Sequence, residues 1–152
     1  MEVTIFYSWQ SDTSRKENYY FIKDCLEAAI KKINAQNKIN GNSLGLTIRI
    51  DHDTKGKSGT PNIVQTIFEK IEKSSIFVAD ITFVGEITAQ EKEEFMPNSN
   101  VLFEMGYAAG KLGWDRIVTV LNSHFGEPSK LPFDLKQRRW PITRPVATGL
   151  IV

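Results

Sequence analysis

The chain has very few of the residues that form covalent or metal cross-links. Its 152 residues include one cysteine, Cys25, and two histidines, His52 and His124. A single cysteine excludes an internal disulfide framework and a cysteine-based zinc site. With only two histidines besides, we expect no structural metal. The fold must therefore rest on packing, and the chain is long enough for one domain with a sizeable core.

An excess of charge of one sign is also missing. Lysine and arginine total 19 and aspartate and glutamate total 18, so the net charge is +1. This balance gives no electrostatic reason to expect a nucleic acid or an anionic membrane as partner. No apolar run approaches the roughly 18 residues of a membrane span, and MEVTIFYSW lacks the basic and apolar regions of a signal peptide. We therefore expect a cytoplasmic protein.

Apolar segments alternate with amphipathic segments along the chain. Their patterns predict strands at Glu2–Ser8, Leu46–Ile50, Ser75–Ile81 and Ile117–Leu121. They predict helices at Ser14–Asn37, from Pro61 after an N-cap at Thr60, and from an Asn98 cap to Leu112. Between the third strand and the last helix lies a long acidic connection, Thr82–Pro97, which is either functional or an insertion. LPFDLKQRRWPIT predicts a short helix and a final edge strand.

This alternation requires right-handed crossovers and a mainly parallel sheet that is covered on both faces. We expect one domain over residues 1–152, with a three-layer α/β flavodoxin-like fold and a five-stranded sheet in the order 2-1-3-4-5. In such a sheet, ligands bind outside the carboxyl ends of strands 1 and 3. The segments expected there are Ser8–Asp12 and the residues from Asp80 onward. A longer protein, with a further domain after Val152, is left open.

Glu104 is the one charged residue between Val101 and Gly110 in NSNVLFEMGYAAG. Helical periodicity places it at the edge of the buried face, near the expected ligand crevice. Because an unpaired buried carboxylate is costly, such a residue needs a reason. We favour catalysis by Glu104, with Asn100 on the same strip as a substrate contact. The alternative is a boundary residue that pairs with Lys111 or with a backbone donor.

The loop that follows the first strand, YSWQSD, combines one aromatic ring with several hydrogen-bonding groups. We expect Trp9 to stack on a planar base, and hydrogen bonds from this loop to ribose or phosphate groups. The residues concerned are Ser8, Gln10, Ser11 and Asp12. Helix capping is an equal alternative for Ser11 and Asp12.

Two further segments carry candidate ligand groups. DTKGKSG offers backbone amides and the charge of Lys55 to a phosphate, although it lacks the GxxxxGK[ST] pattern of a P-loop. A solvated turn and a protein contact are alternatives for this segment. Asp80 ends the third strand, where a ligand contact and a cap on the next segment are equally expected.

The order of these segments resembles a known family. VTIFYSWQSD, IDHDTKGKSGTPNIVQTIFEKIEKSSIFVADIT, PNSNVLFEMGYAAGKLGWDRIVTVLN and LPFDLKQRR resemble bacterial Toll/interleukin-1 receptor (TIR)-like domains of anti-phage defence proteins. The NxNVxxExGYA segment is its most specific part. It is also similar to the nucleoside deoxyribosyltransferase pattern, whose nucleophile is the Glu of a comparable ELGYA segment.

The resemblance implies a function. It implies that the domain cleaves NAD+ between nicotinamide and ribose, with Glu104 as the catalytic residue and NAD+ as substrate rather than cofactor. It further implies self-association through the Asp53–Asn62 loop, activation by oligomerisation, and a sensor domain or partner protein. Two alternatives stay open. One is a deoxyribosyltransferase-like enzyme in which Glu104 attacks a nucleoside, and the other is a non-catalytic TIR module that signals by self-association.

Overall fold

The centre of the molecule is a mainly parallel sheet. The computed structural model describes residues 2–39, 47–51, 62–89, 92–137 and 142–143. Four parallel strands lie in the order β2 (Thr47–Asp51), β1 (Glu2–Ser8), β3 (Ile76–Asp80) and β6 (Ile117–Asn122). The two-residue β7 (Ile142–Thr143) pairs with β6. The expected strand order is confirmed, and the expected fifth strand amounts to these two residues.

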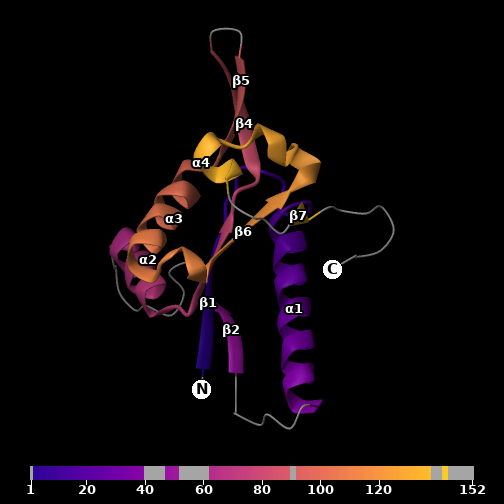
Figure 1. Cartoon of the computed structure of the whole chain (residues 1–152), viewed down its shortest axis with the longest axis vertical. Helices are drawn as coiled ribbons and strands as arrows, with labels where there is room; N and C mark the ends of the chain where they lie inside the picture. The colour runs from indigo at the N-terminus through magenta and orange to yellow at the C-terminus, as the bar shows by residue number, and fades with distance from the viewer. Residues whose placement is uncertain (1, 40–46, 52–61, 90–91, 138–141, 144–152) are drawn as a thin grey trace.

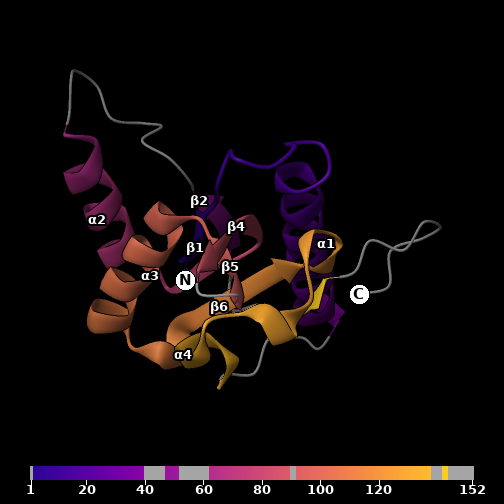
Figure 2. The same cartoon turned by 90° about the horizontal axis from the view of Figure 1, so that it is seen from above.

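Helices cover both faces of the sheet. Helix α1 (Tyr19–Ile39) lies on one face, and α2 (Ile63–Lys73) and α3 (Ser99–Leu112) lie on the other (Figures 1 and 2). Shorter helical segments follow α3 along the chain: η1 (Trp114–Arg116), η2 (Ser123–Phe125), η3 (Pro128–Lys130) and α4 (Phe133–Lys136). The three-layer α/β architecture is therefore as expected. No helix in the described ranges is both long and apolar enough to cross a membrane.

Successive residues of a strand point to opposite faces, so each strand supplies two cores. Phe6 and Phe77 stack 5.8 Å apart in the core beneath α2 and α3. Tyr7 and Val78 lie in the core beneath α1. This burial on both faces explains why the strands read as almost continuous apolar runs.

The helix boundaries agree with the sequence where a strong cap is present. The Asn98 side chain accepts hydrogen bonds from the backbone N–H groups of Asn100 (2.9 Å) and Val101 (3.1 Å), as predicted. The predicted Thr60 cap of α2 was wrong. Asn62 caps this helix through the N–H of Gln65, because asparagine is at least as good a cap as threonine.

The first turns of α1 and α2 differ from a simple apolar pattern. Ile63 and Val64 are apolar yet 62% and 52% exposed, so the buried face of α2 does not include its first turn. Helix α1 begins at Tyr19 rather than at Ser14. Turns precede it, in which the backbone N–H groups of Glu17 and Asn18 donate to the Ser14 carbonyl.

The acidic connection Thr82–Pro97 contains a hairpin of β4 (Phe83–Ala89) and β5 (Lys92–Pro97), which projects from the body (Figure 1). The rings of Phe83 and Phe95 meet at its base with centroids 5.3 Å apart. A Cβ at Gly126 would lie 2.6 Å from the Phe83 ring, so this close approach requires glycine. The sequence did not predict these strands, because their glutamates interrupt the apolar pattern.

Candidate functional site

The end of β1 is joined to the middle of α3 at the carboxyl edge of the sheet. The Ser8 hydroxyl donates a hydrogen bond of 2.6 Å to Oε2 of Glu104, 96 positions later in the chain. The strand pleat explains the direction of Ser8, because it has the same parity as Phe6, which packs under α2 and α3. Glu104 is half-buried, beside the fully buried Met105.

Lys111, the alternative partner expected for Glu104, pairs with another carboxylate. The Lys111 ammonium lies 3.0 Å from the carboxylate of Glu72 on α2. The Tyr107 hydroxyl donates to the same carboxylate at 2.6 Å, and this hydrogen bond is the main reason that the pKa of Glu72 is lowered. Lys111 and Tyr107 thus join α3 to α2, and Glu104 projects toward β1 instead.

A second contact fastens the loop after β1 to the start of α3. The Asn98 amide nitrogen donates to Oδ2 of Asp12 at 2.6 Å, while the Asn98 amide oxygen caps α3. A carboxylate at this position also interacts favourably with the partial positive charge of the helix N-terminus. The loop after β1 and the helix that carries Glu104 are therefore connected at two points.

Another loop residue, Gln10, forms its hydrogen bonds within the loop. Gln10 is buried, and its side-chain oxygen accepts the backbone N–H groups of Asp12 (2.6 Å) and Thr13 (3.0 Å). Its amide group thus shapes the loop. Ser11 is exposed.

The Trp9 side chain packs on the α1 side of the sheet. Its ring lies 4.4 Å from the ring of Tyr19 (centroid to centroid), and the Arg15 guanidinium carbon lies 5.2 Å from its centroid. Trp9 is half-buried against the core beneath α1. The expected stacking on a substrate base would have to share this ring with the contacts to Tyr19 and Arg15.

Asp80 lies in a buried network on the α1 face. One of its oxygens accepts the Asn18 side-chain amide at 2.7 Å, and the other accepts the backbone N–H of Thr82 at 3.0 Å. This is the capping alternative expected for Asp80. Because Asp80 is two residues after Val78, its side chain points to the same face of the sheet, beneath α1 and away from Glu104. Burial raises the pKa of the Asp80 carboxyl.

The same network joins β6 to the start of α1. The Thr82 hydroxyl donates to the Asn18 amide oxygen (3.3 Å) and accepts the backbone N–H of Asn122 (3.0 Å). The Asn122 amide donates to the backbone carbonyl of Glu17 at 2.9 Å. Sequence analysis missed Asn18 and Asn122, although Asn122 ends an apolar strand just as Asp80 does.

Comparison with known proteins decides the family. The profile of the family described as "CAP12/Pycsar effector protein, TIR domain" matches residues 20–136, which is most of the chain. The chain belongs to this TIR-domain family. The expected TIR-like domain of a defence effector is thereby confirmed, and an effector family of this kind points to an enzymatic role.

One solved structure similar to this TIR domain is the 2-desoxiribosyltransferase from Leishmania mexicana. It is 23% identical over 78% of this chain and 64% of that chain, with a TM-score of 0.37. The chain thus spans less than two thirds of that structure's length, and a similarity this weak bears on neither fold nor activity. No curated protein matches the sequence.

Asn100 and Lys55 are the two remaining residues expected in the site. Asn100 is exposed in the first turn of α3, and its backbone N–H donates to the Asn98 cap. Lys55 and the rest of Asp53–Asn62, except Asn62 itself, lie outside the described residues. The structure thus brings together Ser8 with Glu104 and Asp12 with the α3 terminus.

Proposed function

We propose that this TIR domain cleaves NAD+ between nicotinamide and ribose, with Glu104 as the catalytic residue. The observation that carries the proposal is the 2.6 Å hydrogen bond from Ser8 to Glu104 at the carboxyl edge of the parallel sheet. This edge is where ligands bind in open α/β sheets. A half-buried carboxylate held at this edge suits catalysis better than structural support.

A single carboxylate is sufficient for this reaction. When the bond between the ribose C1′ and the pyridinium nitrogen breaks, its electron pair goes to nitrogen, and nicotinamide leaves as a neutral molecule. No general acid is needed, unlike in most glycoside hydrolysis. The ribose gains oxocarbenium character, which the negative charge of Glu104 stabilises. Water then adds to C1′ and releases a proton, giving ADP-ribose, or an adenine nitrogen attacks C1′ and releases a proton, giving a cyclic ADP-ribose.

Ser8 and the Asp12–Asn98 contact support this role. A hydrogen bond to one carboxylate oxygen restricts the orientation of Glu104, and such positioning lowers the barrier of a reaction whose charge develops at one atom. The Asp12–Asn98 contact fixes the loop above the end of β1. We further propose that the Asp53–Asn62 segment mediates self-association and that activity rises when the domain is concentrated or clustered.

The test is incubation of concentrated protein with NAD+ and separation of the products by chromatography with mass detection. Wild type is compared with Glu104→Gln and with Glu72→Gln, which makes the same chemical change on the neighbouring helix. We expect wild type and Glu72→Gln to release similar amounts of nicotinamide, each matched by an equal amount of ADP-ribose or of cyclic ADP-ribose. Glu104→Gln should release almost none. Equal turnover in Glu104→Gln and wild type would remove Glu104 from the mechanism.

A parallel incubation with purine and pyrimidine nucleosides tests the transferase alternative. Release of free base from nucleosides, without release of nicotinamide from NAD+, would assign the site to deoxyribosyl transfer. The absence of both products at every protein concentration, including clustered protein, would favour a non-catalytic TIR module.

A further inference from the structure

Strand β2 is an outer strand of the sheet. It pairs with β1 from Thr47 to Asp51, and no strand in the described ranges pairs with its other side. The peptide groups on that side alternate as donors and acceptors, which makes them a template for pairing with another chain.

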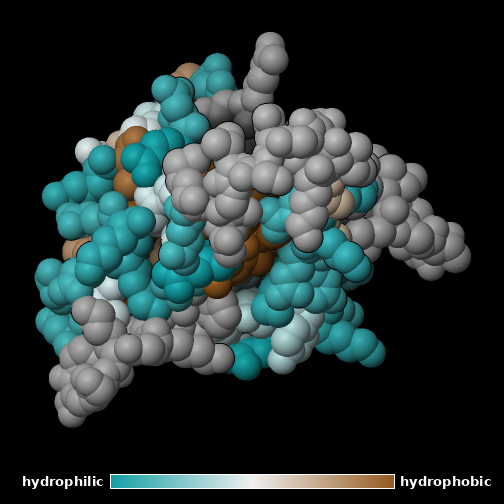
Figure 3. All heavy atoms as spheres, turned by 90° about the horizontal axis from the view of Figure 1, so that it is seen from below, coloured by the Kyte–Doolittle hydropathy of each residue, from teal (hydrophilic) through white to brown (hydrophobic). Residues whose placement is uncertain are grey.

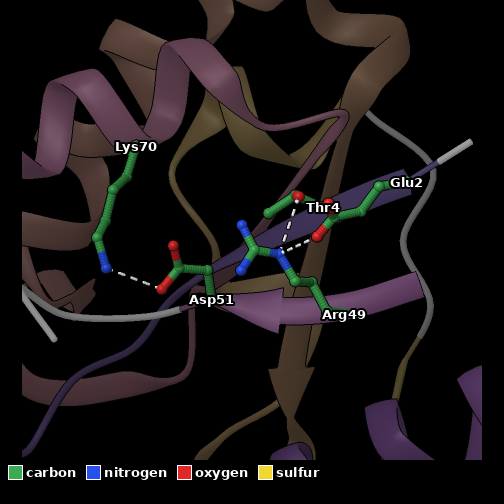
Figure 4. A network of polar contacts seen from close by, with 5 residues as sticks. All are labelled: Glu2, Thr4, Arg49, Asp51 and Lys70. Atoms are coloured by element: carbon green, nitrogen blue, oxygen red, sulfur yellow. Dashed lines mark hydrogen bonds and ion pairs between the residues drawn. The ribbon is translucent and has the colours of Figure 1, made fainter. Parts of the chain in front are cut away.

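The charged side chains of β2 are paired within their own chain. Nε of Arg49 lies 2.6 Å from the Glu2 carboxylate, and Lys70 of α2 lies 2.8 Å from Asp51 (Figure 4). Both side chains are thus engaged by the strand and the helix of their own chain. Each charge thus has a partner of opposite sign in its own chain, which weakens the protection that charge gives against edge pairing, although the Arg49 side chain is 59% exposed.

The face of β2 that is directed toward α1 borders an apolar groove. Ile48 and Ile50 form it together with Ile30 of α1, and its volume is about 570 Å³. Figure 3 views the molecule from the end at which β2 begins, and apolar side chains are visible there in a recess between hydrophilic ones. An exposed apolar groove of this kind, beside an unpaired strand edge, is typical of a protein interaction site.

Three polar residues of α1 line the rim of this groove: Glu27, Lys31 and Asn34. Their spacing of four and three residues places them along one flank of the helix. The Asn34 side-chain oxygen is buried and has no hydrogen-bond partner among the described residues. Glu27 and Lys31 are both exposed and carry opposite charges one turn apart. Glu27 also accepts a hydrogen bond from the Lys23 ammonium of its own helix at 2.6 Å, and its side chain remains 54% exposed, so it can receive a second cation.

We propose that this surface binds a second copy of the chain, with the two β2 strands antiparallel about a two-fold axis. A two-fold contact requires a surface that is complementary to itself. When two α1 flanks meet antiparallel, Glu27 of each copy faces Lys31 of the other. When the strands pair about Arg49, Ile48 of each copy lies opposite Ile50 of the other, and the two sheets become continuous. The two Arg49 side chains then lie opposite each other, each neutralised by Glu2 of its own chain.

This contact differs from the self-association proposed for the Asp53–Asn62 segment. A two-fold contact closes on itself and gives a dimer, whereas a head-to-tail contact can repeat and build a filament. The dimer does not depend on NAD+ cleavage, so either proposal can fail without the other.

The test is sedimentation equilibrium of the full chain over a wide concentration range. The variants are Lys31→Glu, Glu27→Lys and the double exchange Glu27→Lys/Lys31→Glu. Each single reversal creates two pairs of like charges per dimer and should raise the dimer dissociation constant about tenfold or more. The double exchange restores both attractions and should restore wild-type affinity. Lys32→Glu, on the solvent side of α1, is the matched control and should leave the dimer unchanged.

Because these side chains are exposed, the variants should fold, which circular dichroism checks. A wild-type chain that stays monomeric at every concentration would overturn the proposal. So would single reversals that dimerise as well as wild type, or a double exchange that fails to restore dimerisation. Hydrogen exchange is the second measurement. The outward-facing amides of Thr47–Asp51 should exchange more slowly in concentrated than in dilute protein, and equal rates would contradict strand pairing.

Discussion

The carboxyl edge of the sheet carries two sets of polar residues, one on each face, and they are built differently. On the α1 face, Asp80 and its neighbours Asn18, Thr82 and Asn122 are fully buried and bonded to one another. On the α3 face, Glu104 is half-buried and is held by the Ser8 hydroxyl. Both sets lie at the end where α/β proteins bind ligands, yet only the second is open to one.

The difference follows from what burial demands of a polar group. A buried carboxylate or amide must be matched by internal donors and acceptors, because it has lost water. The four residues around Asp80 satisfy this demand, and their hydrogen bonds join β3, β6 and the start of α1. A substrate would have to displace those bonds. Glu104 retains solvent access, so a substrate can reach it without disrupting the fold.

Neutralising Glu104 should give the largest effect on activity and almost none on stability. Glu104→Gln keeps the volume and the hydrogen-bonding capacity toward Ser8 but removes the charge that we propose stabilises the oxocarbenium ion. We expect NAD+ turnover to fall at least about 100-fold. The melting temperature, followed by circular dichroism, should stay close to that of wild type. A large loss of stability in this variant would assign Glu104 to the fold.

Truncating Asn18 should lower the stability of the fold and leave activity almost unchanged. Asn18→Ala removes the donor to Asp80 and the acceptor of the Thr82 hydroxyl, leaving buried groups without partners. We expect the free energy of unfolding in urea to fall by about 2 kcal/mol. Turnover per folded molecule should change little, measured at a temperature at which both proteins are folded. The mild exchange Lys32→Ala on the solvent side of α1 serves as a control for truncation of a side chain.

Much of this arrangement could be predicted from the sequence. The parallel strands, their order and the Asn98 cap follow from apolar runs, crossover rules and a side chain suited to capping. Glu104 could be singled out because a lone charge in an apolar helix is conspicuous. The hairpin in Thr82–Pro97 was missed because a solvated two-stranded ribbon needs no continuous apolar pattern.

The sequence could not predict that the polar residues on the α1 face are buried and bonded to one another while Glu104 on the α3 face is only half-buried. The sequence places Ser8, Trp9 and Asp80 at one edge of the sheet. Only the pairing register of the strands shows that the Ser8 side chain lies on the α3 face and the other two lie on the α1 face. Sequence patterns also do not reveal that Asn18 and Asn122, distant along the chain, complete the hydrogen bonds of Asp80 and Thr82. Capping and ligand binding draw on the same polar residue types, so geometry has to decide between them.

Removing the Ser8 hydroxyl should have an intermediate effect, confined to the open face. Ser8→Ala deletes the hydrogen bond that orients Glu104 but leaves its charge in place. We expect kcat for NAD+ cleavage to fall about tenfold, since a hydrogen bond to a charged group contributes about 1.5–3 kcal/mol. KM should change less than kcat, because Ser8 acts through Glu104. A change in KM alone would instead assign Ser8 to substrate binding, the role expected from the sequence.

The smallest effect should appear in the pH dependence of stability, and it should come from the buried face. Burial raises the pKa of Asp80 above its ordinary value of 3.8 in the folded protein. The folded state then holds the Asp80 proton more tightly than the unfolded state does. The stability contributed by this proton is fully present below pH 3.8 and is lost as the pH rises through the folded pKa.

Asp80→Asn cannot ionise at this position, so its stability should lack this loss. The difference in free energy of unfolding between wild type and Asp80→Asn should therefore shift in favour of the variant as the pH rises from below 3.8 toward neutrality. Urea unfolding at a series of pH values measures this difference directly. Glu104→Gln provides the comparison on the other face and should not remove the component due to Asp80. A difference between wild type and Asp80→Asn that is constant with pH would show that Asp80 has the same pKa folded and unfolded, and that its face of the sheet is wetter than its contacts indicate.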